Sequence, residues 1–551
     1  MRTLTLSFTV LFLLAVSSAF GQTSPTVRVG NTTIVGRQIP NFGQDFFGGI
    51  PYAEPPTGLR RFVPPALKTR LDVSTFNATE YGATCIQPAA GVPLVSEDCL
   101  SVNILRPSGL PAGDRLPVLF WTYGGGFLNG NTVVYNATLI VQQSVARGTP
   151  IIFVSFNYRL GPLGFPQGLE AAEHGALNLG LKDQLAALEW VQANIQFFGG
   201  DPRKVTMFGE SAGSTLTSLS FLNPSINRLA RAGIFESGWA STLGMYPPSR
   251  NQVDWDNFAS SIPTCAGLPA SQIFSCIQLN ASSSEILTAI TSADALSVEL
   301  YAWTPVLDGE LITDLPSKLL AEGQFAKLPF MTGTNLDEGT LFTPQTFNST
   351  EDLEEFLYEG MLRMGANLSA PPSEALRKSV QELLVLYPDE PALGAPFGTG
   401  NDTFGLSPVF KRTAAILTDL MFLALRRQTV SAFNLAGVPV YSYLFTQPQP
   451  ELPAYDGVTH GTEVAYVYGY PADQSAVSIA LSDVMVDYWI SFATSLTPND
   501  GLGIARPRWE EYTLTNETLM QLNGANLTLI PDNFRTEQTN FINANSELWG
   551  R

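Results

Sequence analysis

Histidine is the scarcest informative residue in this 551-residue sequence, which contains only His174 and His460. Two histidines argue against a catalytic metal site built on several imidazole ligands, so no metal is predicted. Basic residues are also few, because 30 Lys and Arg face 49 Asp and Glu, for a formal net charge of −19. This charge argues against nucleic acid or an anionic membrane as a partner, since both attract basic proteins.

Long hydrophobic runs are rare as well, and the clearest one lies at the N-terminus. Arg2 precedes an apolar stretch, and small residues follow it up to Ala19-Phe20-Gly21. This order is typical of a secretory signal peptide, predicted here over residues 1–21, with cleavage between Ser18 and Phe20 as the alternative. A membrane anchor is disfavoured because the apolar core is shorter than the roughly 20 residues that cross a bilayer. No later stretch is expected to cross one, so the mature chain is predicted to be secreted, extracellular and soluble.

Cysteine is limited to four residues, which form two pairs close in sequence: Cys85 with Cys99, and Cys265 with Cys276. Of the three possible pairings, the simplest joins these neighbours. Each bond would close a short loop, a constraint worth about 3 kcal/mol in the chain-entropy model. Four free thiols are not expected outside the reducing cytosol.

Asn-x-Ser/Thr sequons, in contrast, are abundant and agree with export through a eukaryotic secretory pathway. The triplet at Asn223 is excluded because Pro224 occupies its middle position. The predicted glycosylation sites are Asn31, Asn77, Asn136, Asn280, Asn348, Asn367, Asn401, Asn516 and Asn526.

The overall composition is that of a folded protein. Hydrophobic residues make up 45% of the chain, charged residues make up 14%, and no polar low-complexity run interrupts it. A sizeable core is therefore expected. No linker rich in Pro, Gly or Ser separates two independent patterns, so residues 22–551 are predicted to form a single domain.

Apolar runs of strand length alternate with longer stretches of helical periodicity from about residue 115 onward. The strand candidates are PVLFWTY, PIIFVSFNYR, KVTMFGES, RAGIFESG, KLPFMTGTN and PVYSYLF. A helix is predicted over LGLKDQLAALEWVQANIQFF, where apolar residues recur three and four positions apart and Gly199, Gly200 and Pro202 then follow. The alternation predicts an α/β fold with a central, mostly parallel sheet flanked by helices. The wide gaps at about 245–320 and 345–430 predict helical insertions.

One serine stands in a context that favours nucleophilic chemistry. The sequence KVTMFGESAGSTLTSLS places Ser211 between Gly209 and Gly213, after an apolar strand and before a helix-compatible stretch. A nucleophile elbow needs this context, because flanking glycines permit the strained backbone that lifts the hydroxyl clear of the sheet. A Gly-x-Ser-x-Gly match alone is weak in a chain with 47 glycines. The strand and the helix around it strengthen the prediction that Ser211 is a nucleophile.

A second glycine-rich segment, Tyr123-Gly124-Gly125-Gly126-Phe127, also follows a predicted strand. Its backbone amides could stabilise the oxyanion that forms on a carbonyl under attack, each donor being worth roughly 3–4 kcal/mol. Ala212, the residue after the serine, would supply a further amide. A tight turn is an equally good interpretation of the segment by itself. A phosphate-binding loop is disfavoured because no Lys-Ser/Thr follows.

The identity of the general base is the most narrowly defined prediction, because the sequence contains only two histidines. In hydrolases with a nucleophile elbow the catalytic order is serine, then carboxylate, then histidine, which excludes His174 and leaves His460. The carboxylate should follow a strand between Ser211 and His460, where Asp337 and Glu338 compete. Either could hold the imidazole tautomer, so both stay open at this point.

Taken together, these motifs give a sequence that resembles the type-B carboxylesterase and lipase family, which includes cholinesterases, fungal lipases, sterol esterases and the adhesion protein neuroligin. The resemblance extends over nearly all of the mature chain. Besides the elbow it includes Glu97-Asp98-Cys99-Leu100-Ser101-Val102-Asn103, Asn157-Tyr158-Arg159 and Phe197-Phe198-Gly199-Gly200-Asp201-Pro202. It implies an α/β-hydrolase fold that works without a cofactor.

The resemblance also implies roles for individual residues at the site. Glu338 would be the triad acid, and Gly125, Gly126 and Ala212 would form the oxyanion hole. The abundance of sequons and the scarcity of lysine further resemble a secreted fungal esterase.

Structural pairs are implied in the same way. Both cysteine pairs would be disulfides. Two ion pairs would be structural rather than catalytic, namely Arg61 with Glu97 and Arg159 with Asp183.

The first disulfide loop departs from two branches of the family. CIQPAAGVPLVSEDC has thirteen residues between its cysteines, whereas relatives that act on lipid droplets carry a long, mobile apolar lid there. The short loop argues against strong interfacial activation. It also contains no tryptophan, with which cholinesterases hold a quaternary ammonium group by cation–π attraction. Choline esters are therefore not expected as natural substrates.

These features predict a secreted carboxylic ester hydrolase acting on a small-molecule or lipid ester. Ser211 attacks, the oxyanion hole stabilises the tetrahedral intermediate, and His460 activates the water that releases the acyl-serine. Lipase, sterol esterase and feruloyl-type esterase activities stay open, with a slight preference for soluble or medium-chain esters. A neuroligin-like binding protein is disfavoured because all three triad residues are present, and a peptidase is disfavoured by the family motifs. No oligomeric state is predicted.

Overall fold

The structure, a computed structural model, describes residues 24–88, 94–111, 113–297, 300–362 and 371–551. The predicted signal peptide and the sequon at Asn367 lie outside the described residues.

Strands and helices alternate along most of the chain. The strands are β1 (Thr26–Val29), β2 (Thr32–Val35), β3 (Arg37–Ile39), β4 (Gln44–Pro51), β5 (Thr75–Asn77), β6 (Thr84–Cys85), β7 (Val95–Ser96), β8 (Ser101–Pro107), β9 (Leu116–Thr122), β10 (Ile152–Phe156), β11 (Gly200–Glu210), β12 (Ala232–Glu236), β13 (Phe330–Asn335), β14 (Val440–Phe445), β15 (Thr518–Leu522) and β16 (Thr528–Pro531). The α-helices are α1 (Thr138–Ala146), α2 (Gly161–Gly164), α3 (Gly168–Glu173), α4 (Leu179–Asn194), α5 (Ala212–Phe221), α6 (Gln252–Ser260), α7 (Ala270–Leu279), α8 (Ser283–Leu296), α9 (Pro316–Ala321), α10 (Thr350–Glu355), α11 (Glu374–Leu386), α12 (Pro408–Thr418), α13 (Ala424–Leu435), α14 (Thr462–Val467), α15 (Ala476–Ser495) and α16 (Thr536–Ala544).

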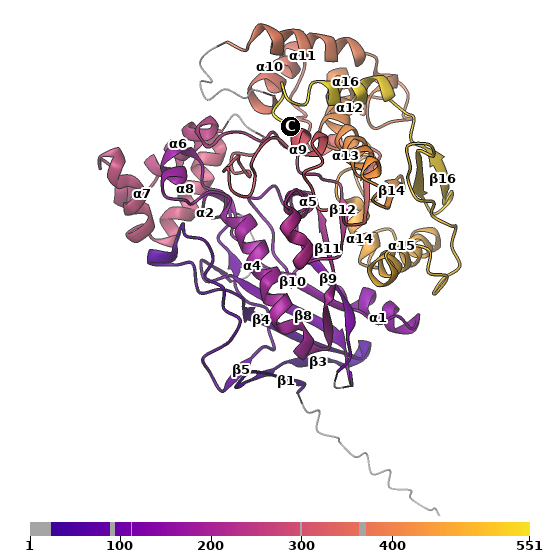
Figure 1. Ribbon diagram of the computed structural model, residues 1–551. Coiled ribbons are helices and arrows are strands. Elements are labelled where there is room, and N and C mark those ends of the chain that lie inside the picture. Colours follow the sequence, from indigo (N-terminus) through magenta and orange to yellow (C-terminus); the bar gives the residue numbers. More distant parts are fainter. Residues whose placement is uncertain (1–23, 89–93, 112, 298–299, 363–370) are drawn as a thin grey trace, which may run out of the picture.

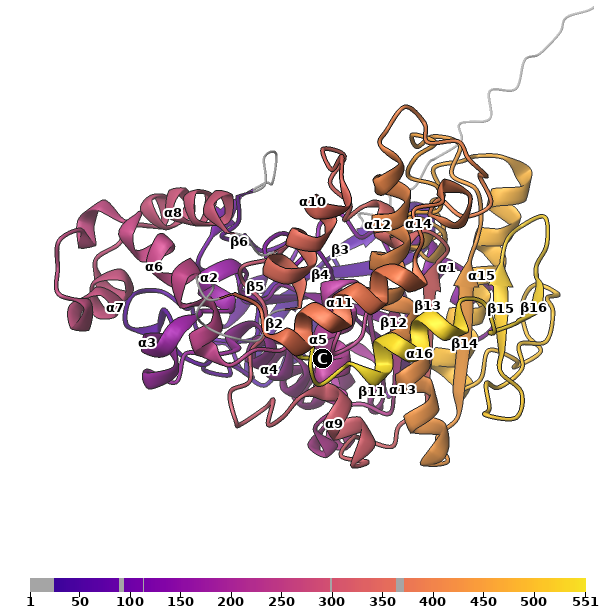
Figure 2. The same ribbon diagram turned by 90° about the horizontal axis from the view of Figure 1, so that it is seen from above.

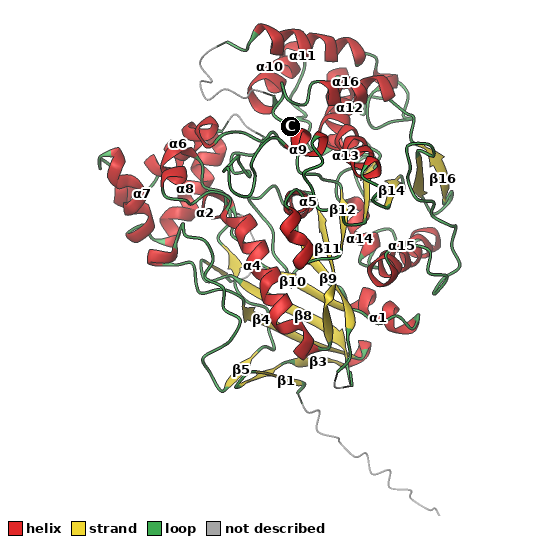
Figure 3. Cartoon of the chain, viewed as in Figure 1, coloured by secondary structure: helices red, strands yellow, loops and turns green. Residues whose placement is uncertain are grey.

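An 11-stranded sheet, in the order β16-β15-β14-β13-β12-β11-β9-β10-β8-β4-β3, forms the centre of the molecule (Figure 3). Neighbouring strands from β10 to β15 run parallel, and antiparallel strands pair at both margins. Helices α4, α5 and α13 cover the near face in Figure 1, and α1 and α15 pack against the far face, as the view from above in Figure 2 confirms. This is the α/β-hydrolase architecture that the sequence predicted.

The predicted strands are confirmed one by one. The six candidate runs correspond to β9, β10, β11, β12, β13 and β14, and the predicted helix corresponds to α4. The leucines, Trp190 and Val191 of α4 are buried except for the half-buried Leu185, and Gly199 follows in the left-handed conformation with φ 92°. The gaps between β12 and β13, and between β13 and β14, hold helical insertions as expected.

The order of the strands fixes the position of the functional site. Strand β9 lies between β10 and β11, so the chain reverses its direction of travel across the sheet at β9. Open parallel sheets bind ligands at the carboxyl ends of the strands beside such a switch point. The glycine run follows β9 and Ser211 follows β11, so both lie at this point.

Helix α15 corrects the expectation that no apolar stretch after the signal peptide is long enough to cross a membrane. Its 20 residues meet that criterion by length and composition. However, 72% of its apolar window is buried inside the protein, where it packs against α1 and α14. The helix is apolar because it lines the core.

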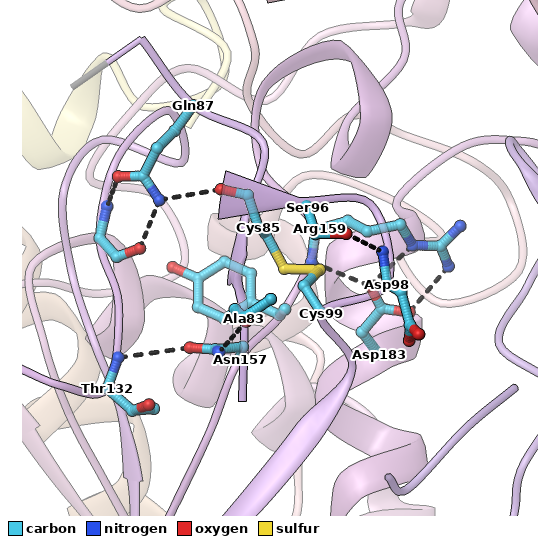
Figure 4. Close-up of a disulfide and its surroundings, with 12 residues drawn as sticks. Ala83, Cys85, Gln87, Ser96, Asp98, Cys99, Thr132, Asn157, Arg159 and Asp183 are labelled. Atoms are coloured by element: carbon cyan, nitrogen blue, oxygen red, sulfur yellow. Dashed lines mark hydrogen bonds and ion pairs between the residues drawn. A yellow bond between two sulfur atoms is a disulfide. The ribbon is translucent and has the colours of Figure 1, made fainter. Parts of the chain in front are cut away.

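Both predicted disulfides are present, Cys85–Cys99 and Cys265–Cys276. Figure 4 shows the first of them beside the buried pair of Arg159 and Asp183, whose Nη2 and Oδ1 atoms lie 2.7 Å apart. The second predicted ion pair, Arg61 with Glu97, is also buried, and its Nε and Oε2 atoms lie 2.7 Å apart. The Arg159–Asp183 pair ties the segment after β10 to α4.

The eight sequon asparagines that lie within the described residues are all exposed. The structure therefore leaves every one of them accessible to a glycosyltransferase.

Candidate active site

Ser211 occupies the sharp turn between β11 and α5. Its φ of 55° and ψ of −128° are strained for a residue with a side chain, which is the backbone that a nucleophile elbow requires. A Cβ atom at Gly209 would lie 2.7 Å from the carbonyl carbon of Gly213, and one at Gly213 would lie 2.1 Å from the carbonyl oxygen of Thr122. Glycine is therefore the only residue that fits on either side of the turn.

The glycine run lies directly beside this serine. Strands β9 and β11 are parallel neighbours with Thr122 opposite Gly209, so the loop after β9 meets the elbow. A Cβ atom at Gly124 would lie 2.8 Å from Cβ of Ser211. Gly125 and Gly126 adopt φ of 107° and 62°. The segment is thus more than a surface turn, because it walls one side of the candidate nucleophile.

His460 follows β14 and is joined to the carboxylate that follows β13. Its Nδ1 atom lies 2.6 Å from Oε2 of Glu338, which is fully buried. The other oxygen of Glu338, Oε1, accepts a hydrogen bond of 2.7 Å from the backbone N–H of Asn335. Asp337 points elsewhere, because its carboxylate accepts hydrogen bonds from the backbone N–H groups of Phe397 and Val458. The geometry therefore distinguishes the two carboxylates that the sequence pattern left open.

Two phenylalanine rings pack against the imidazole of His460. The ring centroids of Phe342 and Phe422 each lie 4.9 Å from that of His460. Phe342 follows β13, whereas Phe422 belongs to η10 (Asp419–Leu423), a π-helical turn between α12 and α13. Neither contact could be predicted from the sequence, because both phenylalanines lie in the insertion between β13 and β14, far along the chain from His460.

Buried carboxylates surround the site, and sequence reasoning missed their role. Oε1 of Glu210 lies 3.2 Å from Nε2 of His460. Glu463 accepts hydrogen bonds from Nδ2 of Asn335 and Oγ of Ser237. The signal for Glu210 was present in the elbow motif itself, where it directly precedes the serine.

These carboxylates act on the histidine electrostatically. Burial alone would lower the pKa of His460, but the negative charges of Glu210 and Glu338 raise it above the ordinary value by more than burial lowers it. Burial raises the pKa of Glu463 to about 7, with the charge of Glu338 adding to the shift. The site therefore stabilises a positive charge on the imidazole, as a base that takes a proton from serine requires.

Tyr301 covers the glycine run from the solvent side. A Cβ atom at Gly126 would lie 2.2 Å from Cε1 of Tyr301, so the ring rests on the backbone of that glycine. Burial raises the pKa of the Tyr301 hydroxyl to about 12, with a further contribution from Glu210. The ring therefore stays neutral and forms an apolar wall.

His174 takes no part in this arrangement. Its ring is exposed and stacks on Phe274 of α7, with centroids 4.1 Å apart. The exclusion of His174 by chain order agrees with its position in the structure.

A strained serine at a strand-to-helix turn, with a buried histidine–glutamate pair at the same edge of a mostly parallel sheet, defines the class of α/β-hydrolases. The chain belongs to the carboxylesterase family, since the family model described as "Carboxylesterase family" matches residues 23–542. It is a serine-type carboxylic ester hydrolase.

Curated relatives and solved structures agree with this assignment. The chain is 34% identical to "Secreted lipase 1" of Botryotinia fuckeliana, covering 95% of this chain and 93% of that lipase. It is 33% identical to "Secreted triacylglycerol lipase LIP1" of Gibberella zeae, covering 95% of this chain and 90% of that protein. The crystal structure of Aspergillus niger EstA superposes with a TM-score of 0.82 at 25% identity, covering 96% of this chain and 99% of EstA.

Proposed function

We propose that the protein is a secreted ester hydrolase that works through a Ser211–His460–Glu338 triad and an acyl-serine intermediate. The observation that carries this proposal is the 2.6 Å contact between Nδ1 of His460 and Oε2 of Glu338, on the strand end that faces the Ser211 elbow. Glu338 fixes the tautomer that leaves Nε2 free to accept the serine proton. Residues 22–551 act as one catalytic domain, and residues 1–21 direct the chain to secretion.

The reaction follows from the positions of these groups. Ser211 attacks the ester carbonyl while His460 accepts its proton, and the C–O bond of the alcohol breaks as His460 returns that proton to the leaving oxygen. The backbone amides of Gly125, Gly126 and Ala212 stabilise the oxyanion. Water then attacks the acyl-serine, with His460 as base, and releases the acid.

The substrate is an ester with an apolar acyl group. Tyr301 supplies aromatic surface beside the glycine run, and Phe342 and Phe422 supply it beside His460, which suits an alkyl chain or an aromatic ring rather than a charged group. The two secreted lipases among the relatives favour lipid esters as the second candidate. The short loop between Cys85 and Cys99 favours soluble or medium-chain esters.

A rate profile on p-nitrophenyl esters from acetyl to palmitoyl, together with methyl ferulate, tests the proposal, with Ser211→Ala as the blank. We expect wild-type hydrolysis that peaks at short or medium acyl chains, and a loss on the order of a millionfold in the variant. A peak at palmitoyl, with a further rise above the solubility limit, would identify a lipase. A wild type as inert as the blank would contradict ester hydrolysis by this triad.

The pH dependence of the rate gives a further prediction. His460 must be neutral to accept the serine proton, and the charges of Glu210 and Glu338 raise its pKa. The acid limb of kcat/KM is therefore expected above 6.5, the ordinary pKa of histidine. In Glu210→Gln the imidazolium loses one stabilising charge, so its pKa falls and the limb shifts to lower pH.

Glu463→Gln serves as the matched comparison in the same pH titration. Its carboxylate is hydrogen-bonded to Asn335 and Ser237 rather than placed against the imidazole, so the expected shift is smaller. An acid limb that stays in place in Glu210→Gln would show that this carboxylate does not set the charge state of His460.

A further inference from the structure

Arg551 is a fully buried arginine that, among the described residues, pairs with no carboxylate. Its Nη1 atom donates to three backbone carbonyl oxygens, at 2.8 Å to Ser241, 2.8 Å to Thr242 and 3.2 Å to Leu420. Burial lowers the pKa of Arg551 to about 10, so the guanidinium still carries its charge at neutral pH. A buried charge held only by carbonyls ties together the segments that supply them.

The first of these segments lies against the nucleophile elbow. Ser241 and Thr242 belong to the loop 237–247 that follows β12. At the start of this loop, a Cβ atom on Gly238 would lie 2.6 Å from the carbonyl oxygen of Ser211, and the carbonyl of Gly238 accepts a 2.7 Å hydrogen bond from Oγ of Ser214. Any shift of loop 237–247 would therefore displace the backbone of Ser211.

The same segment as Arg551 anchors this loop a second time. The backbone N–H of Met245 donates a 2.6 Å hydrogen bond to the carbonyl of Gly550. Leu243 lies between the two anchored points, is half-buried, and packs against both hydrophobic clusters of the protein. One of those clusters contains Phe342 and Phe422, the rings that flank His460. Leu243 therefore packs against the cluster to which these two rings belong.

The second segment lies against the histidine. Leu420 belongs to η10, and Phe422 of the same turn packs against the imidazole of His460. The first residue of η10, Asp419, is fixed by hydrogen bonds from Nε of Arg535 at 2.8 Å and from the hydroxyl of Tyr387 at 2.7 Å. Leu420 directly follows Asp419, so the bond from Arg551 links this fixed end of the turn to loop 237–247.

We propose that Arg551 is a positioning residue that holds loop 237–247 and turn η10 at a fixed separation and so sets the width of the acyl-binding side of the active site. The proposal rests on the proposed function, because it concerns the walls around Ser211 and His460. Without the guanidinium, the three carbonyl oxygens would lose the donor that they share, and the two walls would move apart. A displacement of about 1 Å near reacting groups can cost on the order of a hundredfold in rate.

Arg551→Met tests this, with kcat and KM measured on p-nitrophenyl butyrate and p-nitrophenyl laurate. We expect kcat to fall by about 10- to 100-fold. The ratio of kcat/KM between the two esters should also change, because a wider wall contacts the two acyl chains differently. Arg551→Lys should restore most of the wild-type ratio, since an ammonium group carries three donors for the three carbonyls.

Arg231→Met is the matched control. Nη2 of Arg231 likewise donates only to backbone carbonyls, at 2.5 Å to Ala493 and 3.3 Å to Thr494, in the last turn of α15. This variant should lower the Tm without changing the ratio between the two esters. If Arg551→Met also lowers the Tm but keeps the wild-type ratio of kcat/KM between the two esters, the proposal is overturned.

Ser317→Ala keeps the test decisive if Arg551→Met does not fold. Oγ of Ser317 donates to the main-chain oxygen of Arg551, so its removal loosens Arg551 without removing the guanidinium. A smaller change of the ester ratio in the same direction supports the proposal, and an unchanged ratio overturns it. A wild type that is inert on both esters would instead contradict the proposed function.

Discussion

His460→Ala is expected to lower kcat on p-nitrophenyl butyrate by on the order of a millionfold. His460 is joined to Glu338 by a 2.6 Å contact at Nδ1 and is the proposed base, so without the imidazole the serine proton has no proposed acceptor. Because serine and histidine act as one unit, Ser211→Ala should cause a similar loss. The double variant should be no slower than either single variant.

The second histidine provides the control for this experiment. His174 is exposed and stacks on Phe274, so His174→Ala should leave kcat within about twofold of wild type. Turnover by His460→Ala at the rate of His174→Ala would contradict the triad. Active-site titration with a phosphonate ester, which phosphonylates an activated serine, would report the same difference independently of turnover.

Glu338→Gln is the second large effect, an expected loss of about 10⁴-fold in kcat with little change in stability. The amide keeps the shape of the side chain and can still accept the hydrogen bond from Asn335, which measures 2.7 Å in the native protein. It can no longer stabilise the imidazolium, and it favours the wrong tautomer at Nδ1. Steady-state kinetics and a thermal melt on the same sample separate the two quantities.

Asp337→Asn is the matched comparison, because it makes the same change one residue earlier. The carboxylate of Asp337 accepts hydrogen bonds of 2.8 Å and 2.9 Å from the backbone N–H groups of Phe397 and Val458. Asparagine has one acceptor oxygen, so one buried N–H loses its partner, at a cost of about 1–3 kcal/mol in the free energy of unfolding. We expect a lower Tm and near-native kcat. The opposite pattern in the two variants would assign the acid to Asp337.

Local sequence patterns were enough to predict most of the central sheet and the order of the site residues along the chain. The strands β9 to β14 have apolar runs buried on both faces, which is why each was visible in the sequence. The proposed nucleophile was visible because an elbow needs glycines at fixed positions around Ser211. The proposed base was visible by elimination, since the sequence contains only two histidines.

The features that could not be predicted from the sequence depend on contacts between segments that lie far apart in the chain. Phe422 reaches His460 only because η10 turns in the π-helical form, and no periodicity marks that turn. Asp337 and Glu338 are adjacent and chemically alike, so only the backbone N–H groups around each of them separate their roles. The apolar sequence of α15 satisfied the criterion for a membrane span because a core helix and a membrane helix are apolar for the same reason.

The way in which the insertion between β13 and β14 is attached has a consequence for how this protein can change. The insertion leaves the sheet at Asn335 and returns at Val440, and the two strands stay in register, with Asn335 opposite Phe445. Doubling the length of a flexible connection costs only about 0.6 kcal/mol in closure entropy. The segment that carries Phe342 and Phe422 can therefore grow, shrink or be replaced while the strand ends that carry the reacting groups stay where they are. The length of this insertion can therefore vary without a change in strand register, provided that Phe342 and Phe422 keep their places beside His460.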